Sequence, residues 1–201
     1  VVDRFNELGL PCFGPTAAAA QLEGSKAFTK DFLARHEIPT AAYRTFDELE
    51  PALEYIREQG APIVIQADGL AAGKGVIVAH SLEDAERAAT DMLQDGSFGE
   101  AGARIVVEEF LEGEEASFIV ITDGNVILPL ATSQDHKARD EGDVGPNTGG
   151  MGAYSPAPVV TPDIEARIMD EVIRPTLEGM KADGNPYLGF LYAGLMIAAD
   201  G

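Results

Sequence analysis

Two apolar segments joined by a short polar turn constrain this chain more than any other feature. Residues 116–122 (ASFIVIT) and 126–132 (VILPLAT) flank Asp123-Gly124-Asn125. An Asp-Gly pair suits the tight turn of a β-hairpin, because glycine adopts positive φ at no steric cost. The sequence therefore predicts a β-hairpin at residues 116–132.

Upstream of that hairpin, helical and strand patterns alternate. Glycines, prolines and helix-capping residues separate the segments. We expect helices at residues 1–9, from Ser25 to about residue 36, from Asp47 and from Ser81, and an Ala-rich helical turn capped by Thr16. We expect strands at 11–13, after residue 42, at 62–67, at 75–79 and at 104–110. The order indicates an α+β fold with a small α+β unit at residues 42–110.

Downstream of the hairpin the periodicity is lost and then returns. Residues 133–160 contain many Gly, Pro, Asn, Asp and Thr residues in no regular spacing. Long stretches of this kind are either functional loops or disordered, so we expect a loop here. A helix at residues 163–181 and a strand at 188–197 complete the expected elements.

Composition limits the possible partners and the compartment. With 34 acidic and 14 basic residues the formal charge is −20, which argues against nucleic acid or an anionic membrane as partner. A phosphate ligand would need a local group of cations and backbone amides. Cys12 is the single cysteine and cannot form an internal disulfide. Without a membrane-length apolar run or signal peptide, the sequence favours the cytoplasm.

A glycine-rich loop is the first candidate for chemistry. Residues 68–75 (DGLAAGKG) lie between two expected strands. Such a loop brings backbone amides close to phosphate oxygens. It is not a Walker A loop. That motif has four residues between its first glycine and Gly-Lys, followed by Ser or Thr and a helix, whereas here three residues precede Gly-Lys and Gly75 and a strand follow. The alternative is a surface turn with a solvated Lys74.

An acidic segment is the second candidate. Residues 106–116 (VVEEFLEGEEA) place five carboxylates after an apolar strand. Most of them suit a solvated turn, because clustered acids repel one another. One or two could face a nucleotide, where a carboxylate accepts hydrogen bonds from ribose hydroxyls.

Cations group in the third candidate, which lies in the expected loop. His136, Lys137 and Arg139 occur in TSQDHKAR, and GPNTGGMGAY follows at residues 145–154. The glycines allow close approach of a small ligand. A lone histidine such as His136 more commonly fills a structural hydrogen-bonding role, and we assign it no proton transfer.

Six segments carry a family resemblance: GPTAAAAQLEGSKAFTK, ADGLAAGKGV, VVEEFLEGEEASF, ATSQDHK, GPNTGGMGAYSP and GFLYAGLMI. Together they resemble the phosphoribosylamine–glycine ligases of the ATP-grasp superfamily. They extend over nearly the whole chain. The glycine loop and lysines match ATP-grasp proteins in general, whereas QDHK with GPNTGGMG is more specific to this ligase.

The resemblance implies an ATP-grasp fold with an incomplete central domain and a small α+β lid. In that scheme residues 1–15 are the remnant of an N-terminal domain and linker. Residues 16–37 and 112–201 form the central domain, and 38–111 form the lid. The implied reaction joins glycine to 5-phosphoribosylamine through a glycyl phosphate, giving glycinamide ribonucleotide, ADP and phosphate in purine biosynthesis. No nucleic-acid or membrane partner is implied.

The resemblance also assigns roles to residues. It places Lys26, Lys74, His136 and Lys137 at the reacting groups. It assigns ATP binding to Lys26, Gln66, Gly69, Gly73, Lys74, Gly75, Glu108, Glu109, Phe110, Leu111 and Glu115. It assigns glycine and the sugar phosphate to Asp135, His136, Lys137, Asn147, Thr148, Gly149, Gly150, Met151 and Gly152. In-line phosphoryl transfer needs positioning and charge neutralisation, which fits lysines and amides.

Two departures from the family pattern affect the expected activity. Gln66 stands where the family has lysine, and loss of that charged contact is worth roughly 10- to 150-fold in ATP affinity. The family's Glu-x-Asn magnesium ligands are expected beyond Gly201, so the chain alone is expected to be inactive. The alternatives are a non-catalytic ATP-binding module and another ATP-grasp carboxylate–amine ligase.

Overall fold

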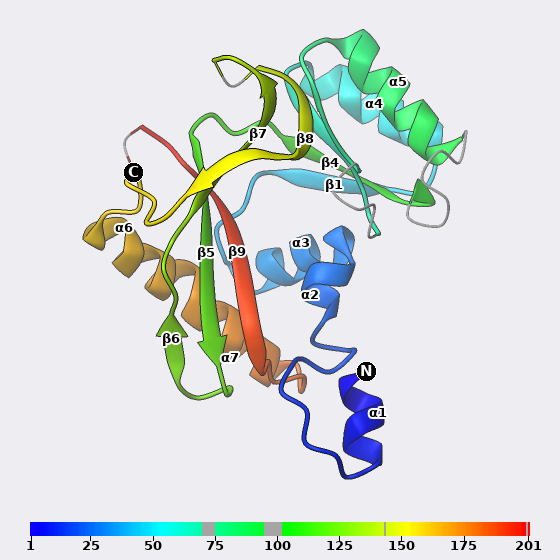
Figure 1. Cartoon of the computed structure of the whole chain (residues 1–201). Helices are drawn as coiled ribbons and strands as arrows, with labels where there is room; N and C mark the ends of the chain where they lie inside the picture. Colours follow the sequence, from blue (N-terminus) through cyan, green and yellow to red (C-terminus); the bar gives the residue numbers. More distant parts are fainter. Residues whose placement is uncertain (70–74, 95–101, 143, 200) are drawn as a thin grey trace. The chain divides into compact units, whose positions relative to one another are not determined.

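The computed structural model describes residues 1–69, 75–94, 102–142, 144–199 and 201. These residues form two compact units (Figure 1). Unit 1 contains Val1–Ala20 and Glu112–Gly201, and unit 2 contains Gln21–Leu111. Residues 21–37, which the family scheme assigns to the central domain, fall in unit 2, and the domain boundaries of that scheme remain a prediction.

Unit 2 is an antiparallel sheet covered by helices. Its strands have the order β1-β4-β2-β3. The strands are β1 (Tyr43–Phe46), β4 (Ile105–Glu109), β2 (Ile63–Ala67) and β3 (Val76–Ala79), and the helices are α2 (Gln21–Gly24), α3 (Lys26–Arg35), α4 (Leu49–Gln59) and α5 (Leu82–Leu93). One face of the sheet packs on α4 and α5 around fully buried Ile56, Ile65 and Met92. The predicted strands and helices of this unit are confirmed.

Helix starts in unit 2 follow the predicted capping residues in two of three cases. The hydroxyls of Ser25 and Ser81 accept hydrogen bonds from the backbone N–H groups of Phe28 and Asp84, each at 3.1 Å. The prediction for Asp47 is wrong: α4 has Glu48 at its N-cap position and no side-chain cap. Serine hydroxyls reach the free amides of the first turn, which explains the two successes.

Unit 1 is built on a three-stranded antiparallel sheet of order β6-β5-β9. The strands are β6 (Ile127–Pro129), β5 (Glu114–Thr122) and β9 (Gly189–Ile197), and the helical segments are α1 (Val2–Glu7), α6 (Pro162–Arg167), η2 (Ile168–Ile173) and α7 (Arg174–Ala182). The β5–β6 pairing runs from Val120↔Pro129 to Thr122↔Ile127. It confirms the predicted hairpin, although its second strand is shorter than expected.

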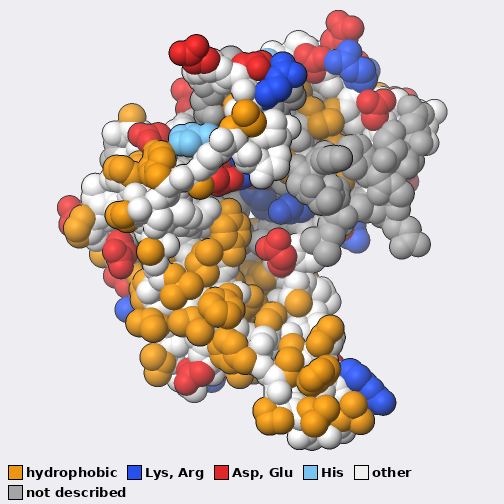
Figure 2. Space-filling model, in the orientation of Figure 1, with side chains coloured by type: hydrophobic (Ala, Val, Ile, Leu, Met, Phe, Trp, Pro, Cys, Tyr) orange, Lys and Arg blue, Asp and Glu red, His pale blue; other side chains and the backbone are white. Residues whose placement is uncertain are grey.

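The two faces of the β5–β9 pair differ in exposure. Ala116, Phe118 and Val120 are buried, whereas Phe190 and Tyr192 are 57% and 47% exposed. Figure 2 shows hydrophobic side chains gathered over β6, β5 and β9. The predicted helix at residues 163–181 is present, with its middle turns in π-helical form. Pro175, at the start of α7, lacks the amide that continues an α-helical ladder.

Two predictions for unit 1 are wrong. Residues 11–13 are not a strand; Pro11 has no N–H to donate, and the ring of Phe13 instead packs edge-on against Phe190 at 6.0 Å. The expected loop at residues 133–160 contains a second hairpin, formed by β7 (Gln134–Asp140) and β8 (Val144–Tyr154). Its register shifts twice, between His136 and Ala138 and between Ala138 and Asp140, which removes the regular alternation that marks a strand in sequence. No helix in the described part of the chain is long and apolar enough to cross a membrane.

Candidate functional site

In unit 2, Asp68 joins the end of β2 to the start of α3. Its Oδ1 accepts hydrogen bonds from Ser25 Oγ at 2.8 Å and from the backbone N–H of Ala27 at 2.7 Å. Its backbone oxygen accepts from the N–H of Lys26 at 3.0 Å, and its other carboxylate oxygen lies 3.1 Å from Nε of Arg104. Lys26 itself is exposed at the first position of α3. The first lysine of the expected phosphate site is therefore held by its backbone, with its side chain in solvent.

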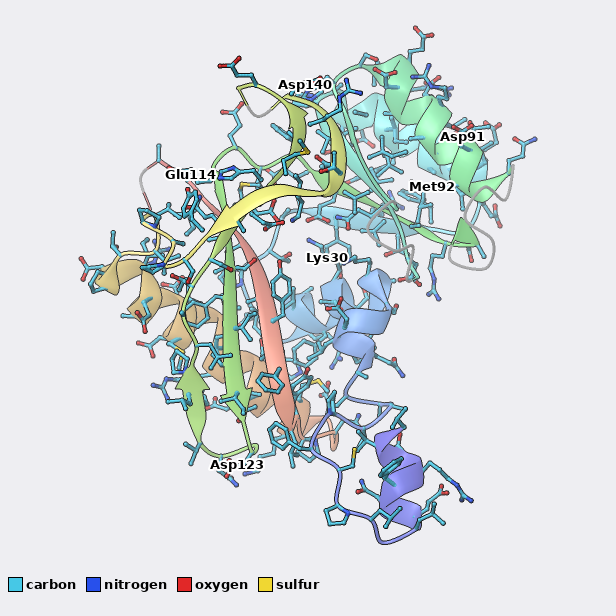
Figure 3. All side chains as sticks on the ribbon, viewed as in Figure 1. Lys30, Asp91, Met92, Glu114, Asp123 and Asp140 are labelled. Carbon is cyan, nitrogen blue, oxygen red and sulfur yellow. The ribbon has the colours of Figure 1, made fainter. Side chains whose placement is uncertain are left out.

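A nearly buried lysine that sequence analysis missed lies one helical turn further on. Lys30 extends from α3 towards β4 (Figure 3) and is 8% exposed. Its Nζ lies 2.5 Å from Oε1 of Glu108 and 2.6 Å from Oγ1 of Thr40. The ring of Tyr43 lies 5.8 Å from the same ammonium. Lys30 thus supplies the positive charge beside Glu108.

Tyr43 contributes a second perturbed group near this ion pair. Burial, and then the hydrogen bond that its hydroxyl donates to Asp31 at 2.8 Å, raise the pKa of Tyr43 to about 12. The phenol is therefore neutral at physiological pH. It offers an uncharged ring to the ammonium of Lys30.

Gln66 lies near the end of β2, within the strand predicted at residues 62–67. Ile63, Ile65 and Ala67 belong to the core against α4 and α5, so Val64 and Gln66 lie on the opposite face of β2. On that face Gln66 donates a hydrogen bond through Nε2 to Oε2 of Glu108. Lys30, Glu108 and Gln66 consequently form one network, which joins α3, β4 and β2.

The residues after Glu108 point to different neighbours. Glu109 is exposed, and its Oε2 accepts from the N–H of Ala42 at 3.2 Å. The ring of Phe110 lies 5.9 Å from that of His80, and Leu111 is 38% exposed. Within the segment 108–111, Glu108 alone belongs to the network with Lys30 and Gln66.

Part of the expected phosphate-binding loop lies outside the described residues. This holds for residues 70–74, and so for Gly73 and Lys74. At the two ends of the loop, Gly69 is half-buried and Gly75 is buried. The backbone oxygen of Gly75 accepts from the N–H of Ala67 at 2.8 Å, which closes the β2–β3 pair.

In unit 1 the β7–β8 hairpin brings together the predicted substrate residues. Asp135, His136 and Lys137 lie on β7, and residues 147–152 lie on β8. Gly152 pairs with His136 and Asn147 with Ala138. Thr148, Gly149, Gly150, Met151 and Gly152 follow one another along the opposite strand, β8, and Met151 is 58% exposed.

Hydrogen bonds fix the shape of this hairpin. Thr148 Oγ1 donates to the backbone oxygen of Lys137 at 3.0 Å and accepts from the N–H of Gly150, also at 3.0 Å. Gly150 has φ of 123°, which a residue with a side chain rarely adopts. The His136 ring lies 5.4 Å from that of Tyr154. The His136 ring thus has an aromatic neighbour, and its place in the substrate site stays a prediction.

Lys137 forms an ion pair with Glu115, the residue expected at the ribose. The Nζ of Lys137 contacts Oε1 of Glu115 and lies 3.8 Å from Oδ2 of Asp135. Burial lowers the pKa of Lys137, but the hydrogen bond and charge of Glu115, with the charge of Asp135, outweigh it and raise that pKa. The lysine is therefore firmly cationic at neutral pH.

Sequence analysis also missed a polar link at the base of the hairpin. Gln134 is 5% exposed; its Nε2 donates to Glu114 at 3.3 Å, and its Oε1 accepts from the Tyr154 hydroxyl at 2.9 Å. Buried polar side chains need such partners. A polar residue such as Gln134 gives no sequence signal of burial, and the irregular register of the hairpin removes the alternation that would have suggested it.

The described residues provide no magnesium site of their own. Among them there is no group of three or more His, Cys, Asp or Glu side chains placed to hold a metal ion. Glu108 and Glu115 are each paired with a lysine, which competes with a cation for their oxygens. We therefore assign magnesium to none of the described residues.

Solved structures share the fold of the chain. A phosphoribosylamine–glycine ligase from Thermotoga maritima matches with a TM-score of 0.84 and 36% identity, over 93% of this chain and 47% of that one. The biotin carboxylase domain of a Hydrogenobacter thermophilus 2-oxoglutarate carboxylase, solved with MgADP, matches with a TM-score of 0.74 and 19% identity, over 100% of this chain and 42% of that one. The fold is thus that of ATP-grasp proteins.

Sequence comparison is more specific. The phosphoribosylglycinamide synthetase ATP-grasp (A) domain family matches residues 24–201. Phosphoribosylamine–glycine ligases from Vibrio vulnificus and Pseudomonas aeruginosa are 73% and 71% identical over 201 residues, which is 100% of this chain and 47% of each relative. The chain belongs to the phosphoribosylglycinamide synthetase ATP-grasp domain family, and it spans about half the length of these curated relatives.

Proposed function

We propose that this chain is the ATP-binding part of an enzyme that joins glycine to 5-phosphoribosylamine. The supporting observation is the 73% identity to a phosphoribosylamine–glycine ligase along all 201 residues. In the proposed reaction ATP phosphorylates the glycine carboxylate, and the sugar amine displaces phosphate to give glycinamide ribonucleotide. The products place it in purine biosynthesis, and the lone Cys12 fits a reducing cytoplasm.

Unit 2 would bind the nucleotide. Within unit 2 we assign Lys26 and Lys74 to the phosphates, and Glu108 and the backbone of Leu111 to the adenine end. The exposed side chain of Lys26 is free to reach an anion, and its ammonium would neutralise phosphate charge as transfer proceeds. ATP-grasp enzymes use magnesium at the phosphates; none of the steps assigned here depends on it.

The β7–β8 hairpin would bind glycine and the sugar phosphate. Lys137 carries a positive charge, and the neighbouring glycines on β8 leave room for a ligand beside the strand. Glu115 would exchange its ion pair with Lys137 for a ribose hydroxyl, which frees the ammonium for the carboxylate or phosphate of a substrate. Orientation and charge neutralisation are the catalytic contributions expected of this hairpin.

Two assays test this proposal. The first is calorimetric titration of ATP into the chain, with expected binding. The second measures product formation by a full-length protein that contains this sequence, with expected turnover only when ATP, glycine and 5-phosphoribosylamine are all present. Turnover with a different carboxylate or amine would favour another ATP-grasp ligase, and ATP binding without any turnover would favour a nucleotide-binding module. The chain alone is expected to bind without turning over.

A further inference from the structure

The carboxylate of Glu108 determines which end of the Gln66 side-chain amide faces it. Nε2 of Gln66 donates to Oε2 of Glu108. An ionised carboxylate only accepts hydrogen bonds, so the NH₂ group must face Glu108 and the carbonyl oxygen must point away from it. Amide orientation, often ambiguous in a glutamine, is therefore settled here by the partner.

Lys30 holds that partner in place. Its ammonium lies 2.5 Å from the other oxygen of Glu108, and the two side chains are 11% and 15% exposed. A second hydrogen bond, to Thr40 at 2.6 Å, fixes the ammonium itself. Removing one member of a nearly buried pair leaves an uncompensated charge, so the pair does not open readily. Lys30 acts on Gln66 only through Glu108, as a positioning residue.

One N–H and the carbonyl oxygen of Gln66 remain after the bond to Glu108. Among the residues that the structure describes, none donates a hydrogen bond to that oxygen. A glutamine amide that offers a donor beside an acceptor matches the edge of adenine, whose N7 accepts and whose 6-amino group donates. Hypoxanthine carries a 6-oxo group there, which would face the amide oxygen with no hydrogen between them.

We propose that Gln66 reads the adenine base through this donor–acceptor pair, and that Lys30 and Glu108 fix the amide in the reading orientation. The inference rests on the proposed ATP-binding function. It gives Gln66 a different role from a lysine at the same position: a lysine donates only, so it can contact N7 or a 6-oxo group but cannot accept from a 6-amino group. Gln66 would raise the preference for adenine, whereas lysine would raise affinity for phosphorylated ligands in general.

The test compares ATP with ITP, whose base carries a 6-oxo group and an N1–H in place of the 6-amino group and the bare N1 of adenine. Dissociation constants of both nucleotides are measured by calorimetry for the unchanged chain, for Gln66→Lys and for Gln59→Lys. Gln59 is an exposed residue at the end of α4, so its substitution adds the same charge elsewhere in unit 2. We expect the ATP-over-ITP preference to fall at least about fivefold in Gln66→Lys and to stay unchanged in Gln59→Lys.

Substitutions at the other two positions test the positioning role. Glu108→Gln keeps the shape of the side chain but no longer dictates which end of the Gln66 amide faces it, so the preference should fall as in Gln66→Lys. Lys30→Met should also lower the ATP-over-ITP preference, whereas Lys30→Arg, which keeps the positive charge, should retain most of it. Lys181→Met removes an exposed lysine of unit 1 and should leave the preference unchanged. Because Lys30→Met can lose folded protein, each titration uses samples whose circular dichroism matches that of the unchanged chain, and Glu108→Gln carries the test if Lys30→Met fails this requirement.

Two outcomes would overturn the inference, and they are distinguishable. Binding of both nucleotides with the same preference in the unchanged chain, Gln66→Lys and Glu108→Gln would overturn the base-reading role and leave the ATP-binding function intact. Failure of the folded, unchanged chain to bind either nucleotide would overturn both.

Discussion

The two units each contain a lysine–glutamate pair, and the pairs differ in exposure. In unit 2 the Lys30 and Glu108 side chains are 11% and 15% exposed, whereas in unit 1 the Lys137 and Glu115 side chains are both 36% exposed. Water screens the second pair far more than the first, and its partners can separate at little cost. The first pair therefore suits a fixed framework, and the second suits a site whose groups must change partners when a ligand arrives.

Loss of the buried lysine in unit 2 is expected to have the largest effect on stability. Lys30→Met leaves Glu108 nearly buried without a cation, and we expect the free energy of unfolding to fall by about 3 kcal/mol. The matched change in unit 1, Lys137→Met, should lower it by less than about 1 kcal/mol. Urea unfolding followed by circular dichroism measures both. Equal losses for the two substitutions would contradict the contrast between a fixed and an exchangeable pair.

A smaller effect is expected at Gln66. Gln66→Lys adds a cation on the face of β2 where the nucleotide is proposed to bind, and ATP affinity should increase about tenfold through a charge-assisted contact. The gain should shrink as salt rises, because screening weakens contacts that remain open to solvent. Calorimetric titrations at low and high salt check this, with Gln59→Lys as the control. If affinity is unchanged, Gln66 lies outside the nucleotide site.

The smallest expected effect concerns the pH dependence of the exposed pair. The pKa of Lys137 is raised in the folded chain above its ordinary value near 10.4, so the unfolded state loses this proton first as pH rises. The stabilisation from the pair is complete below about pH 10 and is lost as pH passes through the raised pKa. Unfolding free energies of the unchanged chain and Lys137→Met should therefore converge as the pH rises above about 10, by less than about 1 kcal/mol. A difference that is constant over this range would show that Lys137 stabilises through packing.

Regular patterning accounts for the parts of the fold that the sequence predicted. The strands of unit 2 alternate between core and opposite face, as at Ile63, Val64 and Ile65, and the Ser25 and Ser81 caps mark their helices. The Asp-Gly turn of the first hairpin is also confirmed: the side chain of Asp123 accepts from the N–H groups of Asn125 and Val126 at 2.9 and 2.8 Å. These signals are local, and local chemistry is what a sequence shows directly.

Features that depend on distant partners could not be predicted. Lysines normally face water, and the burial of Lys30 in α3 depends on Glu108, 78 residues away. The β7–β8 hairpin has glycines, a proline and two register shifts in place of the β-branched alternation that marks strands. The grouping of Asp135 to Lys137 with residues 147–152 was predicted by family resemblance, and the structure adds the strand pairing that brings them together.

The interruption of unit 1 by unit 2 has a consequence for the growing polypeptide on the ribosome. All of unit 2 lies between Gln21 and Leu111, so its core can form as soon as that segment has emerged. The central strand of unit 1, β5, must wait for β9, since Glu114 pairs with Ile197 and Thr122 with Gly189. Domains fold as units during synthesis, in order of emergence. Unit 2 can thus be complete while β5 is paired only with β6, and β5 stays in that state until residues 189–197 have left the ribosome.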